Sequence, residues 1–288
     1  MRFATFNVLH GRTLRDGRPV AVSGVDVALP LREAVASWDA DVVALQEVDR
    51  LQRRSGGVDQ ASVAADAMAA RDWRYGSAAH GRTVPGAGWV FDPAVPGLRV
   101  YGSRDVDREG DVPSHGVALL TRLPVREWRA RRFTPAPFGL PLRVAGRPGL
   151  TLVRDQPRAA LAAVVVGPRG PFTVVAVHLS FVPGWNIGQL LTVRDWIAGL
   201  PRPHVLLGDF NLIGAVARVA LNAAEVMSPV RGRSWRDLAR VATYPAHRPL
   251  VQFDHVLAAG LPVSAAVGVR TPGTPVSDHQ PLVVDVAL

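Results

Sequence analysis

The sequence contains neither cysteine nor lysine. Without cysteine the chain has no disulfide, no thiolate nucleophile and no thiolate zinc site, so oxygen and imidazole groups are the remaining candidate metal ligands. Without lysine, all 33 basic residues are arginine, and against 24 acidic residues they give a net charge of +9. Such a charge fits nucleic acid or an anionic surface as a partner. The arginines are spread along the chain, however, and the one dense cluster, Arg126–Phe133, is interpreted as a solvated loop or sheet edge.

Long apolar runs are also missing. No stretch approaches the length that crosses a bilayer, and the amino terminus has no charged segment followed by an apolar leader. The sequence therefore predicts a protein without a membrane span, and its strand-like start at Arg2 favours the cytoplasm. With 288 residues, 48% hydrophobic content and no recognisable linker, we expect one domain over residues 1–288. Nothing in the sequence indicates an oligomeric state.

Periodicity predicts few helices and many strands. Helical spacing of apolar residues indicates helices at Leu29–Ala40, Asp59–Asp72 and Ile187–Leu200. Short apolar runs indicate strands at Arg2–Val8, Asp41–Asp49, Gly116–Arg122, Arg158–Val166, Phe172–Ser180, His204–Phe210, Gln252–Ala259, Val263–Arg270 and Pro281–Leu288. The stretch Gly81–Pro113 is rich in glycine and proline and is predicted to be an irregular loop, of a length that is usually functional or mobile. This mixed order predicts sheets packed together with helices outside.

Polar side chains stand where the apolar runs end. Asp209 and Asn211 follow a buried strand, and residues i and i+2 of a strand project to the same side. Other strand ends supply the rest of this set: Asn7, Glu47, His178, Asp254 with His255, and Asp278 with His279. One such residue would be ordinary, but a series of them predicts a cluster of acids, amides and imidazoles on one rim of the sheets.

This combination of side chains suits a metal-bound phosphate. Mg²⁺ prefers oxygen ligands, typically one or two carboxylates with water and substrate phosphate at the other positions, and Glu47 and Asp209 fit that description. Two histidines without cysteine are also compatible with zinc, but the spacings typical of zinc enzymes, such as H-E-x-x-H, are missing. Hydrolysis of a phosphate ester needs stabilised charge on the non-bridging oxygens and an in-line water.

Residue type alone leaves simpler interpretations open. Asn7 is equally suited to terminating a strand, and Asp254 to capping a turn. His255 lies one residue from Asp254 and points the other way, so we expect it to be structural or exposed. The remaining histidines receive no functional role: His10, His80, His115, His204 and His247.

Six segments, taken in order, resemble the endonuclease/exonuclease/phosphatase superfamily of metal-dependent phosphohydrolases: "TFNVLHG", "ALQEVD", "GVALLTRLP", "VAVHLS", "GDFNL" and "SDHQP". The superfamily includes deoxyribonucleases, abasic-site endonucleases, sphingomyelinases and inositol-polyphosphate phosphatases. The resemblance extends over the whole chain. It implies an α/β (α+β) fold, a four-layer αββα sandwich with two packed mixed sheets and helices outside, and Mg²⁺ or Mn²⁺ as the cofactor.

The resemblance implies roles for the residues around the metal and the water. Glu47 resembles the family's principal metal ligand, with Asn7 beside it on metal or phosphate and Asp278 as an acidic neighbour near the metal. Asp209 resembles the residue that positions or deprotonates the attacking water. Asn211 resembles the amide that holds both the phosphate and that aspartate in place.

The resemblance also implies a set of groups around the phosphate. His178 and His279 resemble the paired histidines on the non-bridging oxygens, Asp254 the acid that hydrogen-bonds the second of them, and Arg158 a phosphate-binding arginine. One departure concerns substrate: position 9 is leucine, where abasic-site endonucleases have an aspartate. Abasic-site repair is therefore not carried over.

Substrate specificity in this family lies in loops, and the candidates here are Gly81–Pro113, Thr134–Gln156 and Val226–Pro249. Arginines in the first two loops suit a nucleic-acid groove, whereas Gly88–Leu98 suits a pocket wall or an apolar tip for lipid. The leading hypothesis is a phosphodiesterase with nuclease-like chemistry, acting by in-line water attack on a phosphoester, with nucleic acid among the candidate partners. The alternatives are a phosphomonoesterase or phospholipid phosphodiesterase on the same core, and a catalytically silent binding module. The near-complete set of acids and histidines argues against the last.

Overall fold

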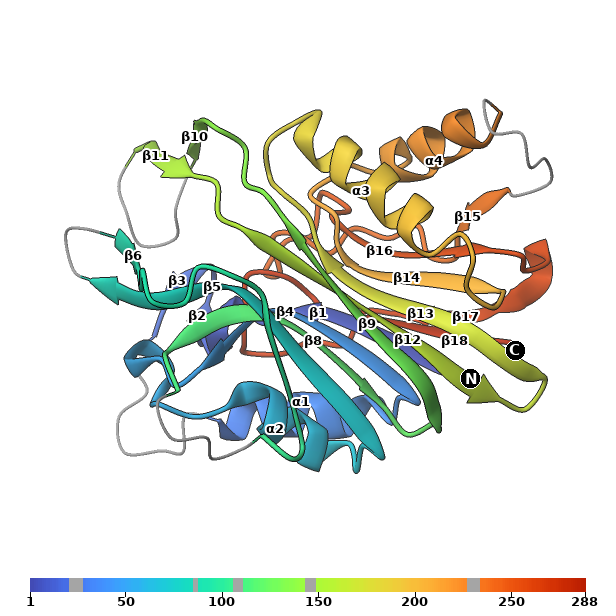
Figure 1. Cartoon of the computed structure of the whole chain (residues 1–288), viewed down its shortest axis with the longest axis horizontal. Coiled ribbons are helices and arrows are strands. Elements are labelled where there is room, and N and C mark those ends of the chain that lie inside the picture. The colour runs from blue at the N-terminus through green and yellow to red at the C-terminus, as the bar shows by residue number, and fades with distance from the viewer. Residues whose placement is uncertain (21–27, 85–87, 106–110, 143–148, 227–233) are drawn as a thin grey trace.

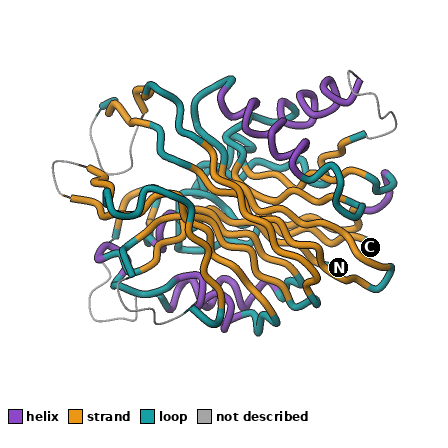
Figure 2. Tube along the Cα trace, viewed as in Figure 1, coloured by secondary structure: helices purple, strands orange, loops and turns teal. Residues whose placement is uncertain are grey.

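The computed structural model describes residues 1–20, 28–84, 88–105, 111–142, 149–226 and 234–288. Two large mixed sheets face each other, with helices on the outer face of each sheet (Figure 1; Figure 2). The first sheet runs in the order β17 (Ala266–Arg270), β18 (Leu282–Val286), β1 (Arg2–Asn7), β4 (Val42–Arg50), β8 (Ser114–Thr121), β5 (Asp72–Val84) and β6 (Gly88–Phe91), with β7 (Arg99–Gly102) also on β5. The second runs β15 (Trp235–Asp237), β16 (Asp254–Ala259), β14 (His204–Asp209), β13 (Gly170–His178), β12 (Arg158–Gly167) and β9 (Val125–Phe133).

The helices form the two outer layers. The first sheet is covered by α1 (Leu29–Trp38) and α2 (Gln60–Ala67), and the second by α3 (Trp185–Trp196) and α4 (Val216–Val226). Short pieces complete the fold: the hairpins β2 (Leu14–Arg15) with β3 (Arg18–Pro19) and β10 (Gly139–Leu142) with β11 (Thr151–Arg154), and the 3₁₀ turns η1 (Leu9–Gly11), η2 (Arg53–Ser55) and η3 (Val263–Ala265). None of the helices in the described part of the chain has the length and apolar character of a membrane-spanning helix.

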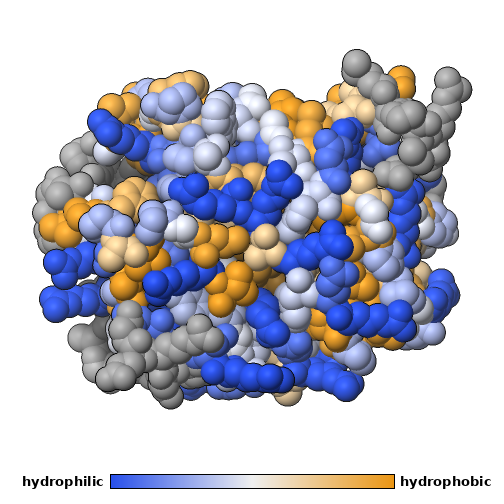
Figure 3. Space-filling view, in the orientation of Figure 1, coloured by the Kyte–Doolittle hydropathy of each residue, from blue (hydrophilic) through white to orange (hydrophobic). Residues whose placement is uncertain are grey.

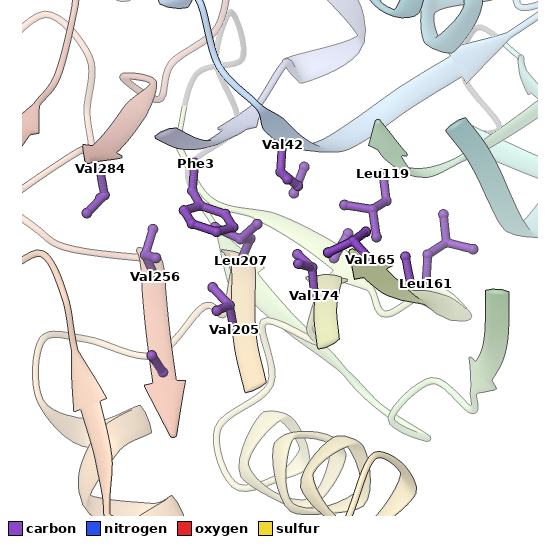
Figure 4. Close-up of a cluster of buried hydrophobic side chains, with 14 of the residues drawn as sticks. Phe3, Val42, Leu119, Leu161, Val165, Val174, Val205, Leu207, Val256 and Val284 are labelled. Carbon is purple, nitrogen blue, oxygen red and sulfur yellow. The ribbon is translucent and has the colours of Figure 1, made fainter. Parts of the chain in front are cut away.

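Alternation along each strand divides the core into three apolar layers. On β1, Phe3 belongs to the layer between the two sheets, whereas Ala4 and Phe6 belong to the layer between that sheet and its helices. The central layer includes Phe3, Val42, Leu119, Leu161, Val174 and Leu207, which point toward one another in Figure 4. The four-layer αββα arrangement predicted from the sequence is therefore confirmed. Figure 3 shows hydrophilic residues spread over the viewed face, as expected for arginines distributed along the chain.

Most predicted elements are present, with several differences. The prediction of an irregular loop at Gly81–Pro113 was wrong, because β5 extends to Val84, pairs with β6 as a hairpin and also carries β7. Glycine makes this pairing possible, since a Cβ at Gly81 would lie 2.0 Å from the carbonyl oxygen of Val90. The elements that were not predicted include α4 and the strands β9, β10, β11 and β15. The second helix ends at Ala67, and Val263–Ala265 form the turn η3 where the start of a strand was predicted.

Two further points complete the comparison. The arginine-rich cluster lies on β9, the edge strand of the second sheet, in agreement with the sheet-edge interpretation. Parts of the three candidate specificity loops, residues 85–87, 106–110, 143–148 and 227–233, lie outside the described residues.

Gly208 allows the central strand of the second sheet to reach the rim. Its φ is +156°, and a Cβ at this position would lie 2.0 Å from the carbonyl oxygen of Val177 on the neighbouring strand. A side chain here would push β14 away from β13 immediately before Asp209. The glycine of the "GDFN" segment is thus required by close packing of two backbones.

We expect Gly208→Ala to destabilise the fold by about 2 kcal/mol or more, because the added methyl group has no room beside the Val177 carbonyl. The matched control is Gly188→Ala on α3, where nothing lies within 4 Å of the new Cβ and alanine favours the helix. Urea unfolding of both variants measures the difference. Equal stability of the two variants would contradict the steric explanation.

Candidate active site

Three predicted site residues stand side by side on neighbouring strands of the second sheet. His178 is the register partner of Asp209 on the parallel strand β14, and Asp209 is the partner of Asp254 on the antiparallel strand β16. Neighbouring strands lie about 4.8 Å apart, so these three side chains begin at the same level of one rim. All three are buried, at 5%, 1% and 0% exposure respectively.

The first sheet brings Asn7 and Glu47 to the same rim. Asn7 ends β1, and its Nδ2 donates to Glu47 Oε1 at 3.3 Å and to Asp209 Oδ2 at 3.0 Å, so this amide joins the two sheets. Its Oδ1 accepts from the backbone N–H of Leu9 at 3.1 Å. Glu47 lies in an irregularity of β4 where the pairing with β8 shifts between Leu45 and Val48, and its φ is +55°. Bulges of this kind redirect side chains and are common beside active sites.

His279 reaches the rim from the loop before β18. Its Nδ1 lies 2.8 Å from Asp254 Oδ2, which also accepts a hydrogen bond from the Thr243 hydroxyl. Burial is the largest effect on the pKa of His279 and lowers it, but the carboxylates of Asp254, Asp209 and Asp278 outweigh burial and raise the pKa to about 10. His279 is therefore an imidazolium at neutral pH. Its Nε2 lies 3.8 Å from Asp209 Oδ2, beyond hydrogen-bond distance.

His178 has the opposite electrostatic environment. Arg158, at the start of β12, places Nη1 3.0 Å from both ring nitrogens of His178. Burial and the Arg158 charge hold the pKa of His178 well below its usual range. The ring is therefore neutral at pH 7, and its Nε2 lies 3.7 Å from Asp209 Oδ2. The two histidines consequently approach the same carboxylate oxygen, one charged and one neutral.

Asn211 holds Asp209 in place. The backbone N–H of Asn211 donates to Asp209 Oδ1 at 2.9 Å, and its side-chain Nδ2 donates to the Leu179 carbonyl at 3.0 Å. The φ of Asn211 is +50°, a conformation that asparagine tolerates better than most residues. Burial raises the pKa of Asp209 to about 6, even though His279, Asn7 and Asn211 favour its charged form. At neutral pH Asp209 is still predominantly a carboxylate.

The chemistry of the side chains fits a hard divalent cation beside Glu47. The side chain of Asp278 forms no hydrogen bond or ion pair with any described residue. Burial raises the pKa of Asp278, the charge of His279 lowers it, and the charge of Glu47 raises it further. Glu47 and Asp278 lie close enough for their charges to interact, and two such carboxylate oxygen donors suit Mg²⁺ or Mn²⁺. A second group, Asp209, Asp254 and His279, has potential ligand atoms within 4.8 Å of one another. Its members Asp254 and His279, however, are already hydrogen-bonded to each other.

The structure thus brings all the predicted site residues to one rim: Asn7, Glu47, Arg158, His178, Asp209, Asn211, Asp254, Asp278 and His279. His255 lies elsewhere. It is fully buried, with Nδ1 3.1 Å from Asp237 and Nε2 2.9 Å from the Leu212 carbonyl, so its role is structural, as predicted.

Two histidines that received no role from the sequence lie close to Glu47. His10 Nδ1 is 3.8 Å from Glu47 Oε2, and His115 is hydrogen-bonded to Asp49, two residues further along β4. His10 stands after a strand end in "NVLHG" and so carried the same positional signal as the predicted residues, whereas His115 stands before the apolar run of "HGVALL" and did not. Their approach to Glu47 depends on the bulge and on strand pairing, which the sequence does not display.

Comparison with known proteins agrees with the fold of this chain. The model of the Endonuclease/Exonuclease/phosphatase family matches residues 4–279. A search of curated proteins found no significant match. Among solved structures, a protein of this family from Leptotrichia buccalis superposes with a TM-score of 0.61 at 13% identity, covering 100% of both chains.

Two other solved structures are similar. An endonuclease/exonuclease/phosphatase from Beutenbergia cavernae has a TM-score of 0.59 at 20% identity, covering 100% of this chain and 71% of that one. A mannosyl-6-phosphatase from Bacteroides thetaiotaomicron has a TM-score of 0.54 at 15% identity, covering 100% of both chains. At these identities the likeness establishes a shared fold.

We expect the stability difference between the wild-type protein and Asp254→Asn to depend on pH. The folded pKa of His279, about 10, lies above the ordinary value of 6.5. Stabilisation by the ion pair is therefore complete below pH 6.5 and is lost as the pH rises through about 10. The variant should lose about 3 kcal/mol at pH 6 and progressively less near the upper limit.

Urea unfolding in EDTA at a series of pH values measures this difference. The control is Asp285→Asn, which removes a partly exposed carboxylate paired with Arg2 at the far end of β1. The control should change stability by less than about 1 kcal/mol at every pH, because the arginine does not titrate in this range. A deficit of Asp254→Asn that is constant with pH would contradict the assigned imidazolium.

Proposed function

Because this chain belongs to the endonuclease/exonuclease/phosphatase family, whose members are hydrolases, we propose that it is a phosphodiesterase that depends on Mg²⁺ or Mn²⁺. The observation that supports this proposal is the position of Asp209 Oδ2. That oxygen lies 3.7 Å from His178 Nε2 and 3.8 Å from His279 Nε2. Both distances exceed a hydrogen bond, so neither ring is committed to Asp209. His279 Nε2 thus remains available to a substrate, whereas the ring of His178 is held by Arg158.

Asp209 is the general base of the proposed reaction. A buried carboxylate with a pKa of about 6 is ionised at neutral pH and still binds a proton readily, which is the combination that general-base catalysis favours. Asn211 and Asn7 fix its two oxygens, at 2.9 Å and 3.0 Å. In the proposed reaction, Asp209 accepts a proton from a water that attacks phosphorus opposite the leaving oxygen.

His279 and Arg158 stabilise the negative charge that develops on the phosphoryl oxygens. Asp254 holds the Nδ1–H of His279, so the protonated Nε2 donates toward the substrate. Arg158 brings a permanent charge beside the neutral His178, whose ring supplies a second polar contact. The carboxylate of Asp209, with a pKa of about 6, and the imidazolium of His279, with a pKa of about 10, are the pattern expected of base and acid partners in one site.

Glu47 and Asp278 are the proposed metal ligands, and Asn7 holds Glu47 in position through its Nδ2. A divalent cation bound there would polarise the phosphoryl oxygens and offset their charge. Glu47 is suited to this role because its side chain remains 24% exposed, whereas Asp254 is completely buried and hydrogen-bonded.

A diester fits the charge of this site better than a monoester. Four carboxylates lie at the rim, on Glu47, Asp209, Asp254 and Asp278, and the described cationic groups facing them are His279 and Arg158. A phosphodiester brings one negative charge into this environment, whereas a monoester near pH 7 brings almost two. A divalent cation at Glu47 and Asp278 would bring the charge of the rim close to zero, so a diester disturbs this balance by one charge and a monoester by almost two.

The test is hydrolysis of bis-p-nitrophenyl phosphate, with p-nitrophenyl phosphate as the monoester comparison. We expect turnover of the diester with Mg²⁺ or Mn²⁺, loss of turnover in EDTA, and a fall in kcat of about 10²–10⁴-fold in Asp209→Asn. The matched control Asp285→Asn also removes one carboxylate and should keep its activity, because Asp285 pairs with Arg2 away from the rim. Turnover that is unaffected both by EDTA and by Asp209→Asn would refute the proposal.

A further inference from the structure

A second polar cluster is built next to Glu47 on a buried carboxylate. Asp49, which is completely buried, accepts from Arg54 Nε at 2.8 Å and Arg54 Nη2 at 2.7 Å, and its Oδ1 lies 2.8 Å from His115 Nδ1. The Ser55 hydroxyl donates to the same carboxylate at 3.1 Å, and Gln60 Oε1 accepts from the Asp49 backbone N–H at 2.8 Å. Residues from β4, η2, α2 and β8 therefore converge to hold Arg54 and His115 in fixed positions.

The charges within this cluster are paired by geometry. Arg54 meets the Asp49 carboxylate with two hydrogen bonds, from Nε to Oδ2 and from Nη2 to Oδ1. If Arg54 served only to neutralise Asp49, we would expect its guanidinium group to be buried. The Arg54 side chain is instead 27% exposed, and the side chain of His115 is 13% exposed.

An aromatic wall connects this cluster to the catalytic rim. Trp89 lies on β6, with its ring centroid 6.0 Å from that of His115 and 5.7 Å from the Arg54 guanidinium carbon. On the other side of His115, the ring of His10 is 6.5 Å away, and His10 Nδ1 is 3.8 Å from Glu47. Figure 1 shows β5 and β6 at one end of the first sheet. Both β4 and β5 pair antiparallel with β8, so β4 and β5 run in the same direction. The end of β5 that pairs with β6 therefore lies at the same end of the sheet as Glu47.

A hollow with excess positive charge opens beside Arg54. It has a volume of about 670 Å³ and is lined in part by Arg53, Arg54 and Arg82. Arg53 and Arg82 are exposed and form no ion pair with any acid among the described residues. Three guanidinium groups therefore surround this space, and the carboxylate of Asp49 balances only one of them. Such a charge balance favours an anionic occupant.

We infer that Arg54 and His115, mounted on Asp49 and flanked by Trp89, form an anion subsite for a second phosphate group of the substrate. The inference rests on the proposed function and narrows its substrate to diesters that carry another phosphate near the one that is cleaved. Asp49 lies two residues beyond Glu47, about 7 Å at the spacing of an extended strand, so one nucleotide or one phosphosugar can span the two positions. Trp89 offers a flat face to the base or sugar between them.

The kinetic test uses two chromogenic diesters that differ in one group: thymidine 5′-(p-nitrophenyl phosphate) and the same compound with a 3′-phosphate. For the wild-type protein we expect KM to be about tenfold lower when the 3′-phosphate is present, as for a charge-assisted hydrogen bond gained. Arg54→Gln should abolish this advantage while turning over the plain diester within about twofold of wild type. The matched control is Arg129→Gln, an exposed arginine on β9 that pairs with Glu127, and it should retain the full advantage.

A second variant keeps the test independent of folding. Arg54→Gln leaves Asp49 with fewer partners, whereas Arg82 touches no acid among the described residues and lines the same hollow. Arg82→Gln should therefore weaken the advantage by about threefold without disturbing Asp49. If both variants keep the wild-type KM ratio, the subsite does not exist.

A binding measurement separates this inference from the proposed function. Calorimetric titration with thymidine 3′,5′-bisphosphate needs no turnover, and we expect Arg54→Gln to bind it about tenfold more weakly than the wild type or Arg129→Gln. A parallel titration with glucose 1,6-bisphosphate shows which kind of molecule supplies the second phosphate. Tighter binding of the nucleotide assigns the subsite to nucleic acid, and tighter binding of the sugar bisphosphate assigns it to phosphosugars.

The two proposals fail in different ways. If the wild-type protein binds the bisphosphate but hydrolyses neither diester, the proposed function fails. If it hydrolyses both diesters and Arg54→Gln behaves as wild type throughout, the subsite fails.

Discussion

The register of three neighbouring strands is the constraint on which the rest of this molecule depends. Parallel pairing of β13 with β14 places His178 opposite Asp209, and antiparallel pairing of β14 with β16 places Asp209 opposite Asp254. A shift by one residue in either pair would turn these side chains into the apolar layers of the sandwich. Alternation of buried valine, leucine and alanine residues along these strands determines their register. The hydrophobic core therefore aligns the three polar groups without contacting a substrate.

The two sheets contribute different chemistry, and the side-chain amide of Asn7 connects acids of both at the rim. The second sheet supplies the histidine and carboxylate pairs, whereas the first supplies Glu47 and, through its loops, Asp278 and His279. Asn7 donates to acids of both sheets, across a sequence separation of 202 residues in the case of Asp209. Opposite shifts in the pKa values of His178 and His279 arise from what lies behind each ring, an arginine in one case and a buried aspartate in the other. Two identical side chains thus acquire different charge states from their surroundings.

Strand ends and their polar residues could be predicted from the sequence, because period-two alternation and abrupt polar termini are local signals. Asp209 and Asn211, two residues apart after a buried strand, are the clearest example. The cluster of Asp49, Arg54 and His115 could not be predicted in the same way. Its members become neighbours through the pairing of β4 with β8 and through the turn after β4. Neither contact produces a periodic pattern of apolar residues in the sequence. The hairpin of β5 and β6 was missed because its glycines, which usually mark loops, here permit close backbone approach.

The loop before β18 joins the two ends of the chain. Ser277 donates its hydroxyl to the Asn7 carbonyl at 2.6 Å and accepts from the His279 backbone N–H at 3.1 Å, while β18 pairs directly with β1. Asn7 is therefore held by a residue that is made 270 positions later. On the ribosome, β1 would have to wait beside an open edge until β18 emerged from the exit tunnel. A nascent polypeptide cannot assemble this rim before the segment from Ser277 to β18 has been translated.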